Sequence, residues 1–362
     1  MKTKKFISLF LAVSLSLPLF SHGRVRGKIN IPDLEGFVTL KCDFHMHTVF
    51  SDGTVWPTTR VNEAYGEGLH AISITDHIEF RPHITRDLVP SHNRGYEIAK
   101  PRAEERGIIL IKGAEITHRM PPGHLNAIFL TDANELDTPN YMDALRAAKA
   151  QGAFIFWNHP CWDAQQPDTV KWFDTHTRIL QEGMMHGIEV VNGADRYCPE
   201  AHRWALEKNL TMIGTSDIHA PMPLAPGEHR SMTLVFARTA TAEGIREALI
   251  ERRTAVYHNH TIIGREEHLK ELFENALEIT TERTGNTVLI TFRNKSDLPF
   301  HLKRVDDYDR RLVYFRHLYI VPNGIQTATV RLTDGITDGE VSFFVENFWV
   351  APNQGMRYVI RI

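Results

Sequence analysis

The sequence predicts an α/β barrel followed by a small antiparallel β-domain. Between residues 36 and 257, short apolar runs alternate with helix-like segments. The runs are almost continuously apolar, which is typical of parallel strands that are buried on both faces. Beyond about residue 265 the chain becomes rich in Val, Ile, Thr, Tyr and Phe and carries turn signals such as Asp338-Gly339. That composition favours antiparallel strands joined by short turns.

Eight apolar runs predict the strands of the barrel. The runs are Leu40–His47, Ala71–His77, Ile108–Ile116, Leu125–Leu130, Ala153–Trp157, Gly187–Asn192, Thr211–Thr215 and Ser231–Ala237. Amphipathic segments between them predict helices, for example at Pro57–Glu67, Pro139–Gln151 and Glu200–Asn209. Seven or eight such units in roughly 220 residues fit a closed barrel better than two packed layers.

The C-terminal part predicts a sandwich-like β-domain. Arg265–Leu277 has the pattern of a short helix or linker. Five segments after it alternate as strands do: Leu277–Thr281, Thr287–Phe292, Leu312–Ile320, Thr327–Leu332 and Glu340–Phe348. We therefore expect a barrel domain over residues 23–264 and a β-domain over residues 265–362, after a signal peptide at residues 1–22.

The first residues predict export. Lys2, Lys4 and Lys5 precede a weakly polar to apolar run of 15 residues, Phe6–Phe20. That run is shorter than the roughly 20 residues that a bilayer span needs, so a cleaved secretory signal is favoured over a membrane-anchoring helix. We expect a periplasmic or secreted protein that has no membrane association after cleavage.

Composition excludes several classes of protein. The 362 residues are 42% apolar and 23% charged, and the formal net charge is −3. These values exclude a disordered chain and a bulk basic field for nucleic acid. The three cysteines, Cys42, Cys161 and Cys198, form no complete disulfide framework. One pair could form in an oxidising compartment, but buried free thiols are the plainer expectation.

Acids and histidines gather at the ends of the predicted strands. The nine are His45, His47, Asp52, His77, Glu115, His124, His159, Asp217 and His219. Strand ends in a parallel barrel converge on one face, where barrel enzymes place their active sites. Nitrogen and oxygen donors without thiolate suit Zn²⁺, Mn²⁺ or Fe²⁺, and nine ligands are enough for two or three ions. Asp76 could instead orient a ligand histidine.

These residues resemble the PHP (polymerase and histidinol phosphatase) superfamily of metal-dependent phosphoesterases. The resemblance covers residues 36–257 and is carried by DFHMHTVFSDG, ITDH, GAE, His124, NHP and SDIH in the family's order. It implies a distorted (β/α)7 barrel with a trinuclear metal site that has the nine residues as ligands. The signal and the β-domain look more like a secreted bacterial branch of phosphodiesterases than like cytoplasmic histidinol-phosphate phosphatases.

The resemblance implies hydrolysis of a P–O bond by a hydroxide that bridges the metal ions. Glu115 and Asp217 are candidates for bridging carboxylates, and Asp217 or His219 is a candidate for proton transfer near the nucleophile or leaving group. Three arginines are candidates for binding the phosphate, because the guanidinium fork matches phosphate oxygens. They are Arg119, Arg196 and Arg230.

Competing functions stay open at this stage. The leading hypothesis is a phosphodiesterase that acts on a small-molecule phosphate ester. Alternatives with the same chemistry are a 5′-3′ exonuclease that cleaves short oligonucleotides and a phosphomonoesterase of the histidinol-phosphatase type. A non-catalytic module that binds glycan or protein is the alternative from another class. The sequence does not predict the oligomeric state.

Overall fold

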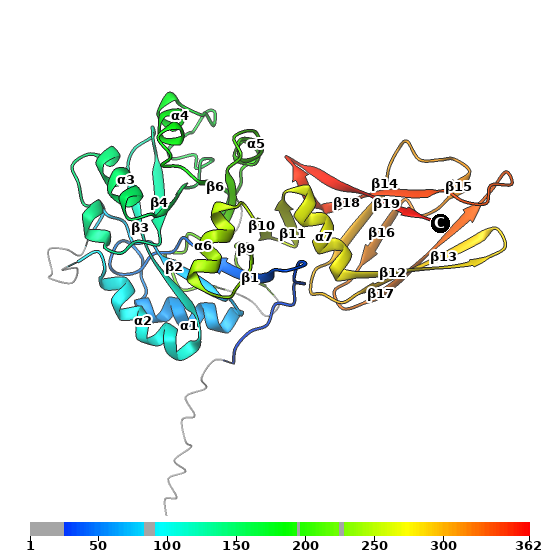
Figure 1. The fold of residues 1–362 in the computed structure, drawn as a ribbon, viewed down its shortest axis with the longest axis horizontal. Helices are drawn as coiled ribbons and strands as arrows, with labels where there is room; N and C mark the ends of the chain where they lie inside the picture. The colour runs from blue at the N-terminus through cyan, green and yellow to red at the C-terminus, as the bar shows by residue number, and fades with distance from the viewer. Residues whose placement is uncertain (1–24, 83–90, 194–195, 224–227) are drawn as a thin grey trace, which may run out of the picture.

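The structure is a computed structural model that describes residues 25–82, 91–193, 196–223 and 228–362. The expected signal peptide lies outside the described residues. A barrel with helices around it forms one end of the molecule, and an elongated β-rich part forms the other end (Figure 1). Within the described ranges, no helix has both the length and the apolar character that a membrane span requires.

Each of the eight predicted barrel runs overlaps a strand. The strands are β1 Val38–Asp43, β2 Ala71–Ile74, β3 Ile109–Thr117, β4 His124–Ile128, β5 Phe154–Trp157, β6 Gly187–Asn192, β8 Thr211–Thr215 and β9 Met232–Ala237. They pair in the order β9-β1-β2-β3-β4-β5-β6-β8. A bridge between Met46 and Ile218 joins the segments that follow β1 and β8. The ends of these strands therefore surround one site.

Helices lie outside the barrel strands. They are α1 Pro57–Glu67, α2 Arg94–Arg106, α3 Tyr141–Ala150, α4 Asp174–Gln181, α5 Pro199–Glu207 and α6 Ala242–Ile250, with a 3₁₀ turn, η2, at Ala133–Leu136. A two-residue strand, β7 Arg196–Tyr197, precedes α5. Gly107 ends α2 in the left-handed conformation with φ of 63°, which a residue without a Cβ adopts at little cost.

The expectation of a wholly parallel barrel was wrong for two strands. β4 runs antiparallel to both β3 and β5, and β9 runs antiparallel to β1. The reversal explains why His124 stands at the start of its strand while Glu115 stands near the end of the strand before it. Thr117 pairs with His124 across the ladder, so the start of β4 lies beside the end of β3. An antiparallel strand thus delivers its ligand to the same face of the barrel.

The C-terminal part is attached through a shared sheet. The remaining elements are β10 Thr254–His258, β11 Thr261–Gly264, α7 Glu266–Ala276, β12 Leu277–Thr284, β13 Thr287–Asn294, β14 Phe300–Arg304, β15 Leu312–Val313, β16 His317–Ile320, β17 Ile325–Leu332, β18 Glu340–Ala351 and β19 Gln354–Arg361. β10 extends the barrel sheet beside β9, and β11 pairs in parallel with β18. A second sheet has the order β12-β13-β17-β15. The predicted antiparallel β-domain is confirmed.

One apolar core continues from the barrel into the β-rich part. Leu269 and Phe273 on α7 are fully buried, as are Phe300 on β14 and Phe348 on β18. The ring of Phe273 packs edge-on against those of Phe300 and Phe348. The same cluster includes barrel residues such as Met46. We therefore expect the two parts to support each other's folding.

The cysteines differ from the plainer expectation of free thiols. Cys161, two residues after His159, forms a disulfide with Cys198 at the start of α5. Cys42 on β1 is a fully buried free thiol. Burial raises the pKa of the Cys42 thiol above its ordinary value, because the thiolate has no water around it.

Thiol titration checks this assignment. We expect no fast-reacting thiol in the folded protein, because Cys42 is buried and protonated. One thiol per chain should react in denaturant, and three should react in denaturant after reduction. Three reactive thiols in denaturant without reductant would contradict the disulfide.

Candidate metal centre

The nine predicted ligands converge at one end of the barrel. Their donor atoms form three groups in which all the atoms lie within 4.8 Å of one another. The groups are His45–His47–Asp217, His77–Glu115–His124 and His47–Asp52–His77–His219. His47 and His77 each belong to two groups, so the three groups are contiguous. His159 lines the same cleft, with its Nε2 atom 3.6 Å from Glu115 Oε1.

The innermost group has the spacing of ligands around one ion. The Nε2 atoms of His45 and His47 are 3.1 Å apart, and each lies 3.1 Å from Asp217 Oδ1. Ligand atoms about 2.1 Å from a shared zinc ion would be about 3.4 Å apart at the tetrahedral angle. Asp217 has a φ of 48°, in the left-handed region that few residues other than glycine adopt. Such backbone strain is typical of functional positions.

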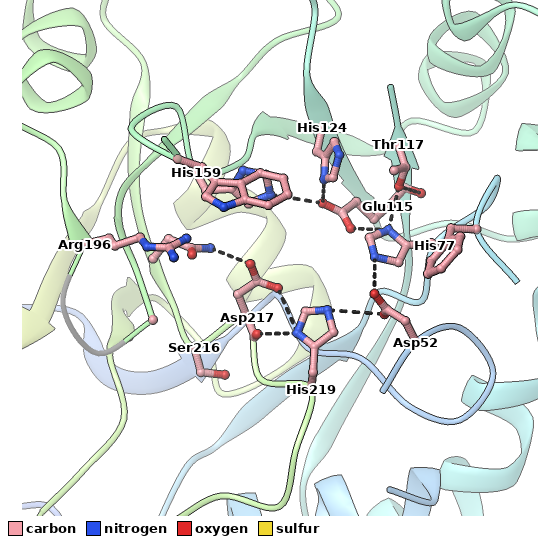
Figure 2. A pocket seen from close by; sticks show the side chains of 14 residues that line it. Asp52, His77, Glu115, Thr117, His124, His159, Arg196, Ser216, Asp217 and His219 are labelled. Atoms are coloured by element: carbon pink, nitrogen blue, oxygen red, sulfur yellow. Dashed lines mark hydrogen bonds and ion pairs between the residues drawn. The ribbon is translucent and has the colours of Figure 1, made fainter. Parts of the chain in front are cut away.

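The second group is centred on Glu115. Its carboxylate is 1% exposed and lies 2.6 Å from His77 Nδ1 and 3.0 Å from His124 Nδ1. Glu115 lies between His124 and His77 in Figure 2. Burial raises the pKa of the Glu115 carboxyl, but the imidazoles of His77 and His124 together hold it well below its ordinary range. The carboxylate is therefore ionised and available to cations.

The third group lies at the rim of the cleft. Asp52 Oδ1 lies 3.3 Å from His219 Nε2, and Asp52 Oδ2 lies 3.4 Å from His77 Nε2 (Figure 2). Asp76 accepts hydrogen bonds from the Thr48 amide at 2.7 Å and from Ser51 Oγ at 2.8 Å. Asp76 therefore fixes the loop that carries Asp52, and among the described residues its carboxylate reaches the ligand His47 only through Ser51, whose Oγ lies 3.4 Å from His47 Nδ1.

The donor set fits divalent ions. Among the described residues, His159 Nδ1 is buried without a hydrogen-bond partner, and Asp217 Oδ1 and Glu115 Oε2 are buried beside imidazole nitrogens without forming a hydrogen bond of good geometry. Unpartnered buried polar atoms are rare in proteins and call for a ligand. All the donors are imidazole nitrogens or carboxylate oxygens, which suits zinc, manganese or iron rather than a thiolate site.

Glu189 orients the site, although the sequence analysis did not select it. His45 Nδ1 donates to Glu189 Oε1 at 2.7 Å, and the His159 amide donates to Glu189 Oε2 at 2.7 Å. The first bond places a proton on Nδ1 and leaves the His45 Nε2 lone pair facing the cluster. The sequence did carry a signal for Glu189, because it is the one acidic residue in the otherwise apolar and amide-containing strand β6, which is buried throughout. His219 Nδ1 is held in a similar way by the Asp217 carbonyl at 2.8 Å.

Several of the candidate metal ligands line a cleft of about 620 Å³. Arg196 lies at one side of the cleft, beyond Asp217, and His77 and Asp52 lie at the other (Figure 2). Phe80 and Trp162 contribute aromatic walls. The cleft is much larger than a phosphate group, so it has room for an ester substituent.

The three arginine predictions differ in outcome. Arg196 is exposed and lines the cleft. Arg119 is exposed in the loop after β3 and is not among the residues that line the cleft. Arg230 corrects the prediction: its side chain is 1% exposed and its guanidinium pairs with Asp43 and Glu67. A guanidinium that two carboxylates already neutralise is not available to bind a substrate phosphate.

The disulfide joins two segments of the cleft wall. Cys161 lies between His159 and Trp162, and Cys198 lies two residues after Arg196. His159, Trp162 and Arg196 line the cleft, whereas the two cysteines are not among its lining residues. The covalent link therefore restrains a ligand histidine and an exposed cation relative to each other.

Comparison with known proteins identifies the family. A solved structure from Bacteroides vulgatus, described as a two-domain protein containing a predicted PHP-like metal-dependent phosphoesterase, is 53% identical. The match covers 93% of this chain and 99% of that chain, with a TM-score of 0.91. The chain therefore belongs to the PHP-like metal-dependent phosphoesterases, and its barrel is of the PHP type. Residues 276–361 match a family model described as an Ig-like domain.

Curated relatives match a shorter segment. An uncharacterized protein of Methanocaldococcus jannaschii is 39% identical over 83 residues, which is 23% of this chain and 36% of the relative. A 5′-3′ exoribonuclease of Haemophilus influenzae is 35% identical over 80 residues, which is 22% of this chain and 24% of that protein. The matched segment thus spans about a third of the length of the first relative and about a quarter of the length of the second.

Replacing Glu189 tests how the centre is oriented. Glu189→Gln removes the carboxylate that fixes the tautomer of His45, so we expect metal affinity to fall roughly 10- to 100-fold. Titration with a competing fluorescent chelator measures the change, and thermal unfolding monitors the fold. Glu207→Gln, an exposed glutamate on α5, is the matched control. Unchanged affinity in Glu189→Gln would contradict the assigned role.

Proposed function

We propose that the protein is an exported phosphodiesterase that uses two or three divalent ions. The observation that carries this proposal is the cleft itself, which joins a dense set of nitrogen and oxygen ligands to one exposed cation. Family membership establishes a metal-dependent phosphoesterase. The preference for diesters, the export and the metal count are our inferences from the site.

Charge in the cleft favours a diester over a monoester. Among the described residues that line the cleft, Arg196 is the sole Lys or Arg. Asp52, Glu115 and Asp217 provide three carboxylates there. A diester has one negative charge near neutral pH, whereas a monoester approaches two, since its second pKa is about 6. The three carboxylates would offset most of the charge of two bound divalent ions, so the one guanidinium that remains matches the single charge of the diester better.

Aromatic walls favour an apolar ester group. Trp162 packs edge-on against His159 and His124, with ring centroids 5.1 and 5.7 Å apart. Phe80 is 51% exposed, although large apolar side chains are usually more buried, and it lines the cleft near His77. These rings supply contact area for a substituent on the phosphate.

The chain's own groups have separable roles. Divalent ions bound by the ligand set would supply Lewis acidity and a water of lowered pKa. Arg196 is placed to bind a non-bridging phosphoryl oxygen and to orient the ester. The His219 side chain is 39% exposed at the rim of the cleft, where its Nε2 atom can hold an ion that would stabilise negative charge on the leaving oxygen. Asp217 and Glu115 are two of the three carboxylates that line the cleft.

The disulfide supports export of the protein. A disulfide between Cys161 and Cys198 suits an oxidising compartment such as the periplasm or the exterior of the cell. The N-terminal pattern of lysines and an apolar run supports the same location.

A 5′-3′ exonuclease is the second candidate. Likeness to the Haemophilus influenzae exoribonuclease over 80 residues favours it. A net charge of −3 disfavours a long nucleic-acid track, because such tracks neutralise several phosphates with Lys or Arg. A 5′-phosphorylated dinucleotide distinguishes the two candidates.

A substrate panel tests the diester preference. We expect kcat/KM for bis(p-nitrophenyl) phosphate to exceed that for p-nitrophenyl phosphate by at least about tenfold, because the cleft supplies one cation and two aromatic walls. The 5′-phosphorylated dinucleotide should be the poorer diester. His47→Ala removes a ligand shared by two groups, so it should abolish hydrolysis while cooperative unfolding persists. Faster monoester hydrolysis, or full activity in His47→Ala, would contradict the proposal.

Arg196 should control substrate binding. Arg196→Ala removes a charge-assisted hydrogen bond worth about 1.5–3 kcal/mol, so we expect KM for the diester to rise about tenfold or more. Initial-rate kinetics separates this rise from any change in kcat. Arg203→Ala on α5 removes an exposed arginine that pairs with Glu207, and it should leave KM unchanged. Equal KM values in both variants would remove Arg196 from the binding site.

A further inference from the structure

A second pocket of about 450 Å³ adjoins the metal cleft. Gly193 and Ser216 line both cavities, so the two meet at these residues. The outer side of the second pocket is formed by Met222, His229 and His260. The proposed function assigns this cavity no role, although it lies directly beside the site where the phosphate would bind.

One wall of the second pocket is a fixed aromatic surface. The His229 ring stacks on Tyr257 with centroids 3.8 Å apart, and its Nδ1 atom lies 2.9 Å from the Arg230 carbonyl. Burial lowers the pKa of His229 below its ordinary value, so the ring is uncharged near neutral pH. The His260 ring lies edge-on to it at 6.0 Å. Both residues line the pocket, so a planar group bound there would contact imidazole rings.

Charge in this pocket disfavours an anion. The Arg230 guanidinium is committed to Asp43 and Glu67, and it is the sole Lys or Arg among the described lining residues. Glu228, an acidic residue, also lines the pocket. Met222 adds an apolar side chain. Among the described lining residues, a second phosphate would find no guanidinium or ammonium that is not already paired with carboxylates, whereas an uncharged ring would find apolar and aromatic contacts.

The backbone holds His260 at this pocket at a cost in stability. Asn259 and His260 form the turn between β10 and β11, with φ values of 44° and 62°. Two residues with positive φ define a turn in which glycine is preferred at the second position. The His260 carbonyl accepts a hydrogen bond of 2.8 Å from Asn347 Nδ2 on β18. The Ig-like domain thus fixes the turn that presents the His260 ring.

We propose that this second pocket binds an aryl or heteroaromatic group of the ester, such as a phenyl ring or a nucleobase, while the phosphate lies in the metal cleft. The proposal rests on the proposed phosphodiesterase function and names its substrate class. His260 is the specificity residue, and the Ig-like domain contributes to substrate selection by holding the turn through Asn347.

His260→Gly separates binding from stability. Glycine adopts a positive φ without strain, so the melting temperature should stay equal or rise. The substitution removes the imidazole ring of His260 from the pocket. We expect the ratio of kcat/KM for bis(p-nitrophenyl) phosphate to that for the ring-free diester glycerylphosphorylethanolamine to fall about fivefold, as for one lost aromatic contact. Phosphorus NMR follows the second substrate. Asn323→Gly is the control, because Asn323 in the Ig-like domain also has a positive φ, of 53°. This variant should keep the wild-type ratio of kcat/KM values.

Adenosine binding tests the pocket without turnover. Saturation-transfer NMR should show contact of adenosine with the wild-type protein and with Asn323→Gly, and weaker contact with His260→Gly. An unchanged ratio and unchanged adenosine contact in His260→Gly would overturn the assignment of the pocket. Failure to hydrolyse either diester would overturn the phosphodiesterase proposal instead, and the adenosine measurement would still decide the role of the pocket.

Discussion

The structure depends on placing several buried carboxylates among imidazoles at one end of the barrel. Glu115 and Asp217 are ionised because His77, His45 and their neighbours offset the cost of burial. Without such partners, burial would favour the protonated acids. The strand ends bring these groups together from widely separated parts of the chain. The fold therefore concentrates negative charge where divalent cations are to be bound.

Surrounding groups hold the ligand side chains of that cluster in fixed orientations. Glu189 directs the His45 ring, and the carbonyl of Asp217 directs His219. Asp76 fixes the loop that carries Asp52. The disulfide restrains the segment after His159, while the β10–β11 turn is held from the Ig-like domain. Rigid support of this kind is what a metal centre requires if its ligands are to keep a productive geometry.

The barrel strands and the convergence of the nine candidate ligands could be predicted from the sequence because both leave strong local signals. Apolar runs mark buried strands, and an acid or histidine at the end of such a run is conspicuous. Strand direction leaves no such signal, so the reversal of β4 and β9 was missed. Arg230 is chemically identical to a phosphate-binding arginine until its partners Asp43 and Glu67 are known. Glu189 was missed for the same reason, since its partners are distant in the chain.

The central claim is that these nine side chains bind two or three divalent ions in one cleft. Anomalous diffraction at the zinc, manganese and iron edges, from crystals of protein purified without added metal, tests it most directly. The account predicts two or three peaks about 2.0–2.3 Å from the imidazole nitrogens and carboxylate oxygens. A single peak outside the cleft, or no peak after soaking in these metals, would contradict it.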